Sequence, residues 1–151
     1  VGVIRSRIGI EHDALVFGPD DDLLGLVKVE LDKRPVDCVL IDEAQFLSKA
    51  QVDQLTKVVD ERNVPVLTYG IRTDFLGETF EGSRYLMAWS DEIKEIKAIC
   101  HCGKKATMNA RVDSSGRMET EGQQIEIGGN ERYVSLCRSC FSMGDTGPSQ
   151  V

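Results

Sequence analysis

The sequence predicts an α/β fold, in which helices cover a parallel sheet, followed by a small β unit that a metal ion holds together. Two observations predict this arrangement. Up to about residue 92, apolar runs of strand length alternate with repeats of helical spacing. From residue 93 onward the apolar segments are short, and four of the five cysteines fall there in two close pairs. We therefore expect domains at 1–92 and 93–142, and a disordered tail at 143–151.

The first elements follow from capping residues and apolar spacing. An extended piece is expected around residues 3–8, and the acidic run 20–22 can cap a helix and place negative charge at its first turn. The apolar residues at helical spacing are Leu23, Leu24, Val27 and Leu31. Pro35 ends this helix. The apolar run 37–41 has the length of a strand covered on both faces, so Cys38 should be buried as a small apolar residue.

A second helix and a second strand repeat the pattern. Ser48 can cap the helix, and Asn63 breaks it. Its apolar stripe consists of Val52, Leu55, Val58 and Val59. Residues 64–69 then form another buried strand, and a third helix is expected from about 83 to 90. Because strands alternate with helices, the sheet should be parallel, and ligands should bind at the carboxyl ends of its strands.

The β unit is built from short elements. Its candidate strands are residues 96–100, 107–112, 124–127 and 133–136. Its candidate turns are residues 113–116 and 128–130. Little apolar surface is available to hold these strands together, so a bound metal is the expected source of stability.

The charge balance excludes one class of partner. The chain has 18 basic and 25 acidic residues, a net charge of −7, and no run of Lys or Arg longer than two. We therefore expect no nucleic-acid partner. ATP is still compatible with this charge, since a few amides, cations and a metal can bind it in an acidic protein. No apolar stretch approaches the roughly 20 residues of a membrane span, so we expect a soluble intracellular protein without a membrane partner.

An acidic pair, Asp42 and Glu43, directly follows the strand at 37–41, and residues 70–72 follow the next strand. An acid at this edge can hold Mg²⁺ through its water shell, and a neighbouring carboxylate can activate an attacking oxygen. On spacing alone, a site of this kind and a solvated turn before the next helix are equally supported. The apolar pair within residues 44–47 favours a site, because a solvated turn does not need it.

The cysteine spacing predicts a structural zinc site. The pattern is Cys100-x-Cys102, thirty-four intervening residues, then Cys137-x-x-Cys140. Four thiolates on two turns can close a tetrahedral shell around Zn²⁺ without leaving an open position. The tight first pair leaves His101 as a replacement ligand if a thiol points away, although a solvated turn residue is the preferred interpretation of His101. Reduced thiols without a metal are the alternative, to which we give a small share.

A weaker feature lies just before the second cysteine pair. It is the run 124–133, which contains a Gly-Gly turn and ends at Tyr133. Exposed backbone in such a turn can offer amide and carbonyl groups to a flat ligand edge, and the tyrosine can add a ring or a hydroxyl. On these residues alone, a hairpin turn with a buried tyrosine is the favoured interpretation.

Three blocks together resemble the zinc-containing thymidine kinases of bacteria and animal cytosol. They are Asp42-Glu43-Ala44-Gln45-Phe46-Leu47, Cys100-His101-Cys102-Gly103, and Ile127-Gly128-Gly129-Asn130-Glu131-Arg132-Tyr133 with Cys137. The resemblance implies a RecA-like α/β domain, with the P-loop type of sheet, and a zinc-held lasso that closes over the nucleoside in a cytoplasmic homotetramer. It implies transfer of the γ-phosphoryl group of ATP to the 5′-hydroxyl of thymidine. The product, dTMP, serves nucleoside salvage and DNA synthesis, and dTTP is the expected feedback inhibitor.

The resemblance also assigns roles to individual residues. Glu43 matches the general base that takes the proton from the 5′-hydroxyl, and Asp42 lies where the acid on the Mg²⁺ side belongs. The segment that contacts the nucleotide is matched by Asp42, Glu43, Ala44 and Gln45. Phe46 matches an aromatic wall of the thymine pocket. The rest of the substrate site is matched by Gln124, Ile125, Glu126, Ile127, Gly128 and Tyr133, and the zinc ligands by Cys100, Cys102, Cys137 and Cys140.

One motif of the family is not found in these residues. The phosphate-binding loop, Gly-x-x-x-x-Gly-Lys-Ser/Thr, is expected to precede residue 1, and we expect a protein made of only these residues to be inactive. Arg5 and Arg7 could approach phosphates, although a solvated role has at least equal weight. The alternative function, from another class, is a non-catalytic zinc-ribbon interaction module on a remnant of the P-loop fold.

Overall fold

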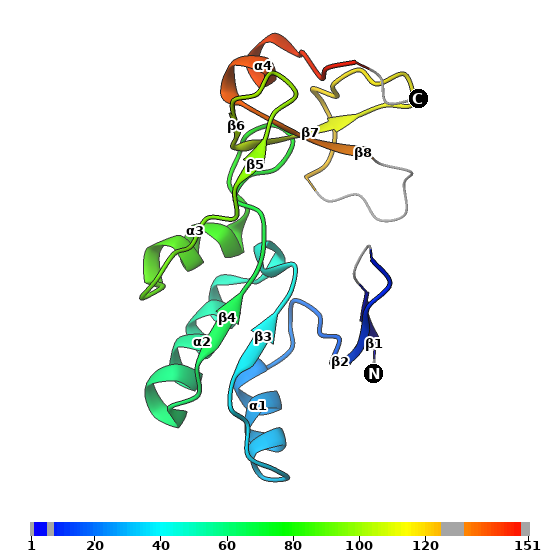
Figure 1. The fold of residues 1–151 in the computed structure, drawn as a ribbon. Helices are drawn as coiled ribbons and strands as arrows, with labels where there is room; N and C mark the ends of the chain where they lie inside the picture. The colour runs from blue at the N-terminus through cyan, green and yellow to red at the C-terminus, as the bar shows by residue number, and fades with distance from the viewer. Residues whose placement is uncertain (1, 6–7, 125–131, 149–151) are drawn as a thin grey trace. The chain divides into compact units, whose positions relative to one another are not determined.

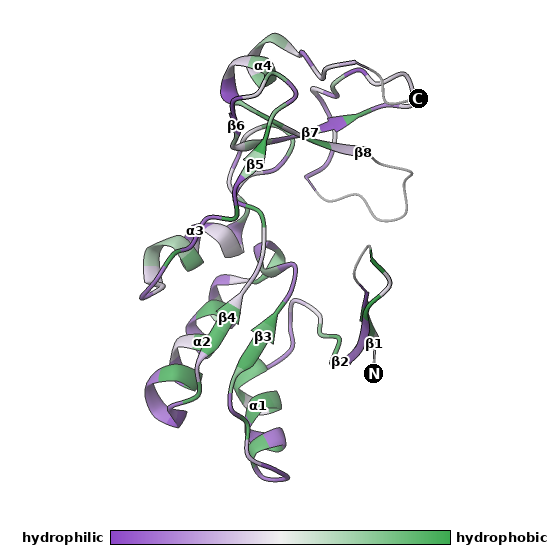
Figure 2. Ribbon diagram, viewed as in Figure 1, coloured by the Kyte–Doolittle hydropathy of each residue, from purple (hydrophilic) through white to green (hydrophobic). Residues whose placement is uncertain are grey.

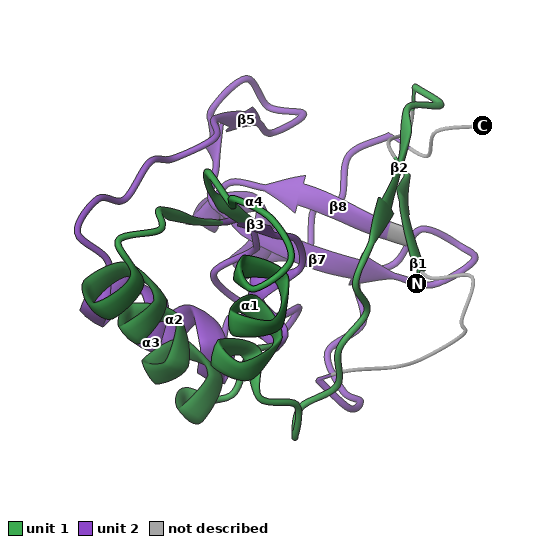
Figure 3. Ribbon diagram, turned by 90° about the horizontal axis from the view of Figure 1, so that it is seen from below, with its two compact units in different colours: residues 1–39, 47–67 green, residues 40–46, 68–151 purple. Residues whose placement is uncertain are grey.

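The structure is a computed structural model of the 151-residue chain, and it describes residues 2–5, 8–124 and 132–148 (Figure 1). The chain divides into two compact units (Figure 3). The first unit consists of residues 1–39 and 47–67, and the second unit consists of residues 40–46 and 68–151. The domain boundary expected at residue 92 stays a prediction.

The first unit begins with an antiparallel hairpin, in which β1 (Gly2–Arg5) pairs with β2 (Glu11–Ala14). The sequence did not predict β2, because its residues lack apolar alternation. An ion pair of 2.5 Å joins Arg5 Nε to Glu11 Oε1, and both side chains are exposed. The role of Arg5 stays a prediction, and Arg7 lies outside the described residues.

Two helices, α1 (Leu23–Leu31) and α2 (Lys49–Arg62), pack together in the first unit. The predicted caps are confirmed. Asp22 caps α1 by accepting a backbone N–H, Ser48 caps α2 in a capping box, and Asn63 ends α2 with φ 53°. The buried apolar side chains of these helices are Leu23, Val52, Leu55 and Val58. Burial of such side chains stabilises the fold by roughly 1.5–3 kcal/mol each.

The two predicted strands between the helices are β3 (Val39–Ile41) and β4 (Val66–Thr68), which form a two-stranded sheet. The first residue of β3 donates its N–H to Pro65 O at 2.9 Å, and the last accepts the N–H of Tyr69 at 2.8 Å. Successive hydrogen bonds lie closer to the C-terminus on both strands, so the two strands are parallel, as the sequence predicts. Figure 2 shows the apolar character of both strands.

β3 was expected to be covered on both faces, and this prediction is wrong for the described structure. Ile41 is 6% exposed, whereas Leu40 is 61% exposed. Side chains alternate between the faces of a strand, so β3 buries one face only. Cys38 is likewise exposed and not buried. The described strands form four two-stranded sheets, and the larger RecA-like sheet stays a prediction.

The second unit combines a short turn of 3₁₀-helix with two helices and two hairpins. Its elements are η1 (Ala44–Phe46), α3 (Glu81–Trp89), β5 (Ala98–Ile99), β6 (Lys105–Ala106), β7 (Met108–Val112), β8 (Arg132–Leu136) and α4 (Arg138–Met143). β5 pairs with β6 and β7 with β8, both antiparallel. Within the described ranges, no helix has the length and apolar character needed to cross a membrane.

The hairpins confirm several predicted elements. β7 and β8 fall at the predicted strands, and the predicted turn after β7 closes with a bond of 2.9 Å from Gly116 N–H to Asp113 O. The expected turn at 128–130 and most of the expected strand at 124–127 lie outside the described residues.

The end of the described chain is held by hydrogen bonds. The Thr146 hydroxyl donates to Gly116 O at 2.8 Å, and the Gly147 N–H donates to the Asp145 carboxylate at 3.1 Å. The disordered tail expected at 143–151 stays a prediction.

Candidate active site and metal centre

The acidic pair lies in a tight turn between β3 and η1. Glu43 has φ 51°, in the left-handed region, which costs a residue other than glycine of order 1–3 kcal/mol. The Glu43 N–H donates to Asp42 Oδ1 at 2.9 Å, and its carbonyl accepts the N–H of Phe46 at 3.1 Å. Both acidic residues are exposed. Strain of this kind concentrates at functional sites, so the turn is a candidate active site.

Gln45 connects Glu43 to the backbone that follows β4. Its side chain donates from Nε2 to Glu43 Oε2, and its Oε1 accepts the N–H of Ile71 at 3.2 Å. Gln45 is 3% exposed. A carboxylate can only accept hydrogen bonds, so the Glu43 contact sets the orientation of the amide. The carboxylate of the candidate base is therefore held by a buried group that is itself fixed.

Gly70, which follows β4 and Tyr69, lies close to this turn. A Cβ atom added to Gly70 would lie 2.6 Å from Gln45 Oε1 and 3.0 Å from Gln45 N. Gly70 follows Tyr69, whose carbonyl accepts the N–H of Ala44 at 2.8 Å. A larger residue would therefore displace the turn that carries Glu43.

We expect Gly70→Ala to destabilise the protein by about 1–3 kcal/mol, because the added methyl group overpacks this contact. Turnover should fall together with stability. Urea unfolding and an activity assay measure the two effects. Gly18→Ala is a matched control, because a Cβ there meets only Asp21 Oδ2, at 3.8 Å. Equal unfolding midpoints for the two variants would contradict this interpretation.

An aromatic pair borders the turn. The ring of Phe46 meets Phe80 edge to face, with centroids 5.6 Å apart and planes at 88°. Phe80 is 5% exposed, whereas Phe46 is 47% exposed and presents the apolar surface expected of a pocket wall. The sequence did not single out Phe80, since nothing local distinguishes it from a core residue.

The remaining predicted substrate residues lie in a different part of the second unit. Tyr133 on β8 is 54% exposed, so the expectation of a buried tyrosine is wrong. Gln124 donates from its side chain to the Asp74 carboxylate at 2.8 Å. The predicted residues Ile125, Glu126, Ile127 and Gly128 lie outside the described residues.

The four predicted zinc ligands come together. The Sγ atoms of Cys100, Cys102, Cys137 and Cys140 all lie within 4.8 Å of one another. Those of Cys102 and Cys137 are 3.6 Å apart. Tetrahedral coordination with Zn–S bonds of about 2.3 Å requires sulfur atoms roughly 3.8 Å apart. The cluster therefore fits a structural zinc ion, and neither thiol of the first pair points away.

Two turns build the cluster. Gly103, with φ 82°, closes the first turn by donating its N–H to Cys100 O at 2.8 Å. In the second turn Cys137 caps α4, and its sulfur accepts the N–H of Cys140. The small core around the cluster consists of Cys100, Ala106, Ala110, Leu136, Cys137 and Cys140, with Met118, Val134 and Phe141 packed against it.

The cluster thiols differ in pKa. Burial alone would raise the pKa of Cys100, but hydrogen bonds from the backbone of Cys102 and Cys137 and from neighbouring thiols lower it to about 6. The N–H of Cys140 lowers the pKa of Cys137. Burial raises the pKa of Cys140. A bound cation would favour the thiolate form of all four.

His101 is not needed as a replacement ligand. Its Nε2 lies 3.1 Å from Asp145 O and 3.5 Å from Asp145 Oδ1. Ligand atoms of His101, Asp145 and Cys140 also lie within 4.8 Å of one another, so this second group shares a cysteine with the first. His101 therefore contacts the chain after α4 and is not simply a solvated turn residue.

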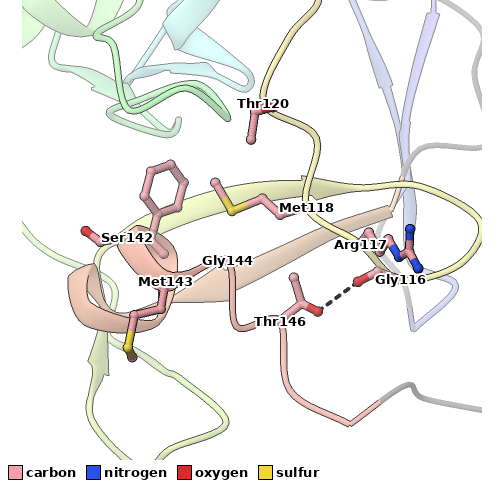
Figure 4. A pocket seen from close by; sticks show the side chains of 9 residues that line it. Gly116, Arg117, Met118, Thr120, Ser142, Met143, Gly144 and Thr146 are labelled. Carbon is pink, nitrogen blue, oxygen red and sulfur yellow. Dashed lines mark hydrogen bonds between the residues drawn. The ribbon is translucent and has the colours of Figure 1, made fainter.

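A hollow of about 610 Å³ in the described surface lies elsewhere (Figure 4). Its lining residues are Gly116, Arg117, Met118, Thr120, Phe141, Ser142, Met143, Gly144 and Thr146. None of them is a predicted site residue, and Arg117 is the one charged residue among them. The geometry of the acidic turn and of the cysteines, and not this hollow, identifies the candidate sites.

The sequence is similar to those of known enzymes. The family model described as "Thymidine kinase" matches residues 1–141. A thymidine kinase of Vibrio cholerae is 55% identical over 141 residues, which cover 93% of this chain and 73% of that protein. One from Xanthomonas campestris pv. campestris is 56% identical over 141 residues (93% and 68%), and one from Legionella pneumophila is 52% identical over 147 residues (97% and 70%).

Proposed function

This chain belongs to the thymidine kinase family, and we propose that Glu43 is the general base of its reaction. The enzyme transfers a phosphoryl group to thymidine. In the reaction that we propose, the donor is the γ-phosphoryl group of ATP, the acceptor is the 5′-hydroxyl, and the products are ADP and dTMP. The observation that carries the proposal is the strained turn after β3, in which Gln45 holds the Glu43 carboxylate.

Glu43 would accept the proton of the 5′-hydroxyl. As this O–H bond breaks, the 5′ oxygen forms its bond to the γ-phosphorus, and the bond from phosphorus to the β,γ-bridging oxygen breaks to release ADP. The Nε2–H of Gln45 donates to one carboxylate oxygen of Glu43, Oε2, so the other oxygen would accept the proton. Positioning of this kind supplies much of the rate enhancement in phosphoryl transfer.

We assign Asp42 to the part of the site that would bind Mg²⁺. One of its oxygens accepts the Glu43 N–H, and the residue is exposed, so its carboxylate can accept hydrogen bonds from the water shell of Mg²⁺. Mg²⁺, when bound with ATP, neutralises charge on the phosphate oxygens. We further propose that Ala44 and Gln45 complete the segment that contacts the nucleotide.

The thymine pocket is the second part of the proposal. Phe46, supported by Phe80, would form one wall, and the exposed ring of Tyr133 would contribute from β8. Gln124 and residues 125–128 would contact the base through their main chain. A site that pairs with the donors and acceptors of thymine would reject bases that lack them.

The four cysteines would hold zinc as a structural cross-link. All four positions of a tetrahedral shell are filled by the chain, so the ion would stabilise the hairpins and take no part in the reaction. A RecA-like core for the α/β part, a homotetramer, feedback inhibition by dTTP and a cytoplasmic location complete the proposal, and they rest on the family alone.

The test is calorimetry of thymidine and dTTP binding to the chain, with zinc quantified on the same sample, and an assay of thymidine phosphorylation by the intact enzyme. We expect thymine-selective binding, about one zinc ion per chain, and turnover that depends on both ATP and Glu43. Zinc without nucleoside binding or turnover would instead support the non-catalytic interaction module.

A further inference from the structure

The segment at residues 119–124 leads to the proposed nucleoside-binding residues, and Arg111 on β7 holds it. The Arg111 side chain is 2% exposed. Its Nε donates to Glu119 Oε2 at 2.5 Å, and its Nη1 donates to Gln123 O at 3.2 Å. Its guanidinium carbon lies 3.7 Å above the centroid of the Phe75 ring. One buried cation therefore binds both ends of this short segment.

Gly122 permits the close approach of the segment to Arg111. It has φ 137°, and a Cβ atom at this position would lie 2.3 Å from Arg111 Nη2. The same Cβ would lie 3.6 Å from Cζ of Phe75. The backbone of the segment thus lies directly against the guanidinium and the ring beneath it.

Asp74 provides a second contact, at the end of the segment. Both oxygens of its carboxylate accept hydrogen bonds: Oδ1 accepts the N–H groups of Leu76 and Glu78, each at 2.9 Å, and Oδ2 accepts Gln124 Nε2 at 2.8 Å. Asp74 is 4% exposed. One oxygen therefore stabilises the turn that contains Asp74, and the other binds Gln124.

We propose that Asp74 and Arg111 are positioning residues for thymidine, which act by fixing residues 119–124. This inference rests on the proposed function. The Gln124 side chain is bound by Asp74, so Gln124 contributes to the nucleoside site through the position of its backbone. Asp74 therefore acts through Gln124, and its role is separate from phosphoryl transfer at Glu43.

The experiment exchanges the two partners of the Asp74–Gln124 hydrogen bond. Gln124→Glu places a second carboxylate against Asp74, and Gln124→Met removes the donor without adding charge. We expect the KM for thymidine to rise roughly 10- to 100-fold in Gln124→Glu and several-fold in Gln124→Met. The KM for ATP should be unchanged, and kcat should change by less than about threefold.

The double variant Asp74→Asn/Gln124→Glu should restore thymidine binding. The asparagine that replaces Asp74 in this variant keeps an Oδ1 for the two backbone N–H groups, and its Nδ2 can donate to the new carboxylate. Ser114→Glu is the control, because it adds the same charge at an exposed position in the turn after β7, outside residues 119–124. Its thymidine KM should stay within about twofold of wild type.

The outcomes separate the two proposals. A wild-type enzyme that does not phosphorylate thymidine overturns the proposed function. An active wild type whose thymidine KM is unaltered in Gln124→Met, or a double variant no better than Gln124→Glu, overturns the positioning role. Thymidine calorimetry on Gln124→Met and the double variant gives the same decision if Gln124→Glu does not fold.

Discussion

Replacing Glu43 by glutamine should lower kcat of the intact enzyme by about 10²- to 10⁴-fold, the usual contribution of a general base. The amide cannot accept the proton of the 5′-hydroxyl. It can still accept the hydrogen bond from Gln45 through its oxygen, so the turn should keep its geometry and thymidine should still bind. Steady-state kinetics with calorimetry of thymidine measures both effects.

The control for this variant is Glu61→Gln, which removes the same charge from an exposed position near the end of α2. Its kcat should stay within about twofold of wild type. If Glu43→Gln also retained full turnover, Glu43 would not be the base. If Glu43→Gln lost thymidine binding and stability together, the residue would instead be structural.

Removal of Cys102, which we propose as a zinc ligand, should unfold the hairpin region. The core of this region is small, so a cross-link from the metal is needed to hold β5 to β8 in place. We expect Cys102→Ser to retain far less than one zinc ion per chain. Its Tm should fall by at least about 10 °C. Thymidine affinity should fall as well, because Gln124 and Tyr133 lie in the same unit.

Cys38→Ser is the matched control, since both cysteines are exposed and only Cys102 belongs to the cluster. Zinc content and Tm of Cys38→Ser should equal those of wild type. Elemental analysis and thermal unfolding with and without a chelator measure the difference. A Cys102→Ser protein with full zinc content would show that three cysteines suffice, with His101 or a solvent ligand as the fourth.

Local signals in the sequence predicted the helices well. Capping depends on a few neighbouring residues, and the caps at Asp22, Ser48 and Asn63 are all confirmed. The cysteine cluster was also predictable, because metal coordination requires close pairs of ligands and the spacing of the pairs is visible in the sequence. The caps are local, and the spacing of the two cysteine pairs indicated the cluster even though it joins residues 35 positions apart.

Distant contacts that no motif indicates were not predictable. The exposure of Leu40 and Cys38 depends on what covers each face of β3, which the apolar run alone does not specify. The hydrogen bonds of Asp145 and Thr146 depend on partners distant in sequence, His101 and Gly116. Burial and tail contacts are set by tertiary structure and not by composition.

Some features of the candidate site were likewise predictable from the sequence, and others were not. The acidic pair at the end of a strand was visible, but the link from Glu43 through Gln45 to Ile71 joins segments that are far apart in sequence. The Asp74–Gln124 bond is equally distant. An isolated aspartate after a strand carries no signal of such a bond, so the positioning residues could be found only in the structure.

The left-handed backbone of Glu43 has a consequence for attempts to engineer this enzyme. Glycine adopts φ 51° without the steric strain that a side chain adds, so Glu43→Gly should relax the backbone of the turn. The same change deletes the carboxylate that we propose as the base, and it leaves the buried Gln45 Nε2–H without its acceptor. These two effects on stability oppose each other, so selection for thermal tolerance alone does not retain the carboxylate. A library at this position must be selected for turnover from the first round.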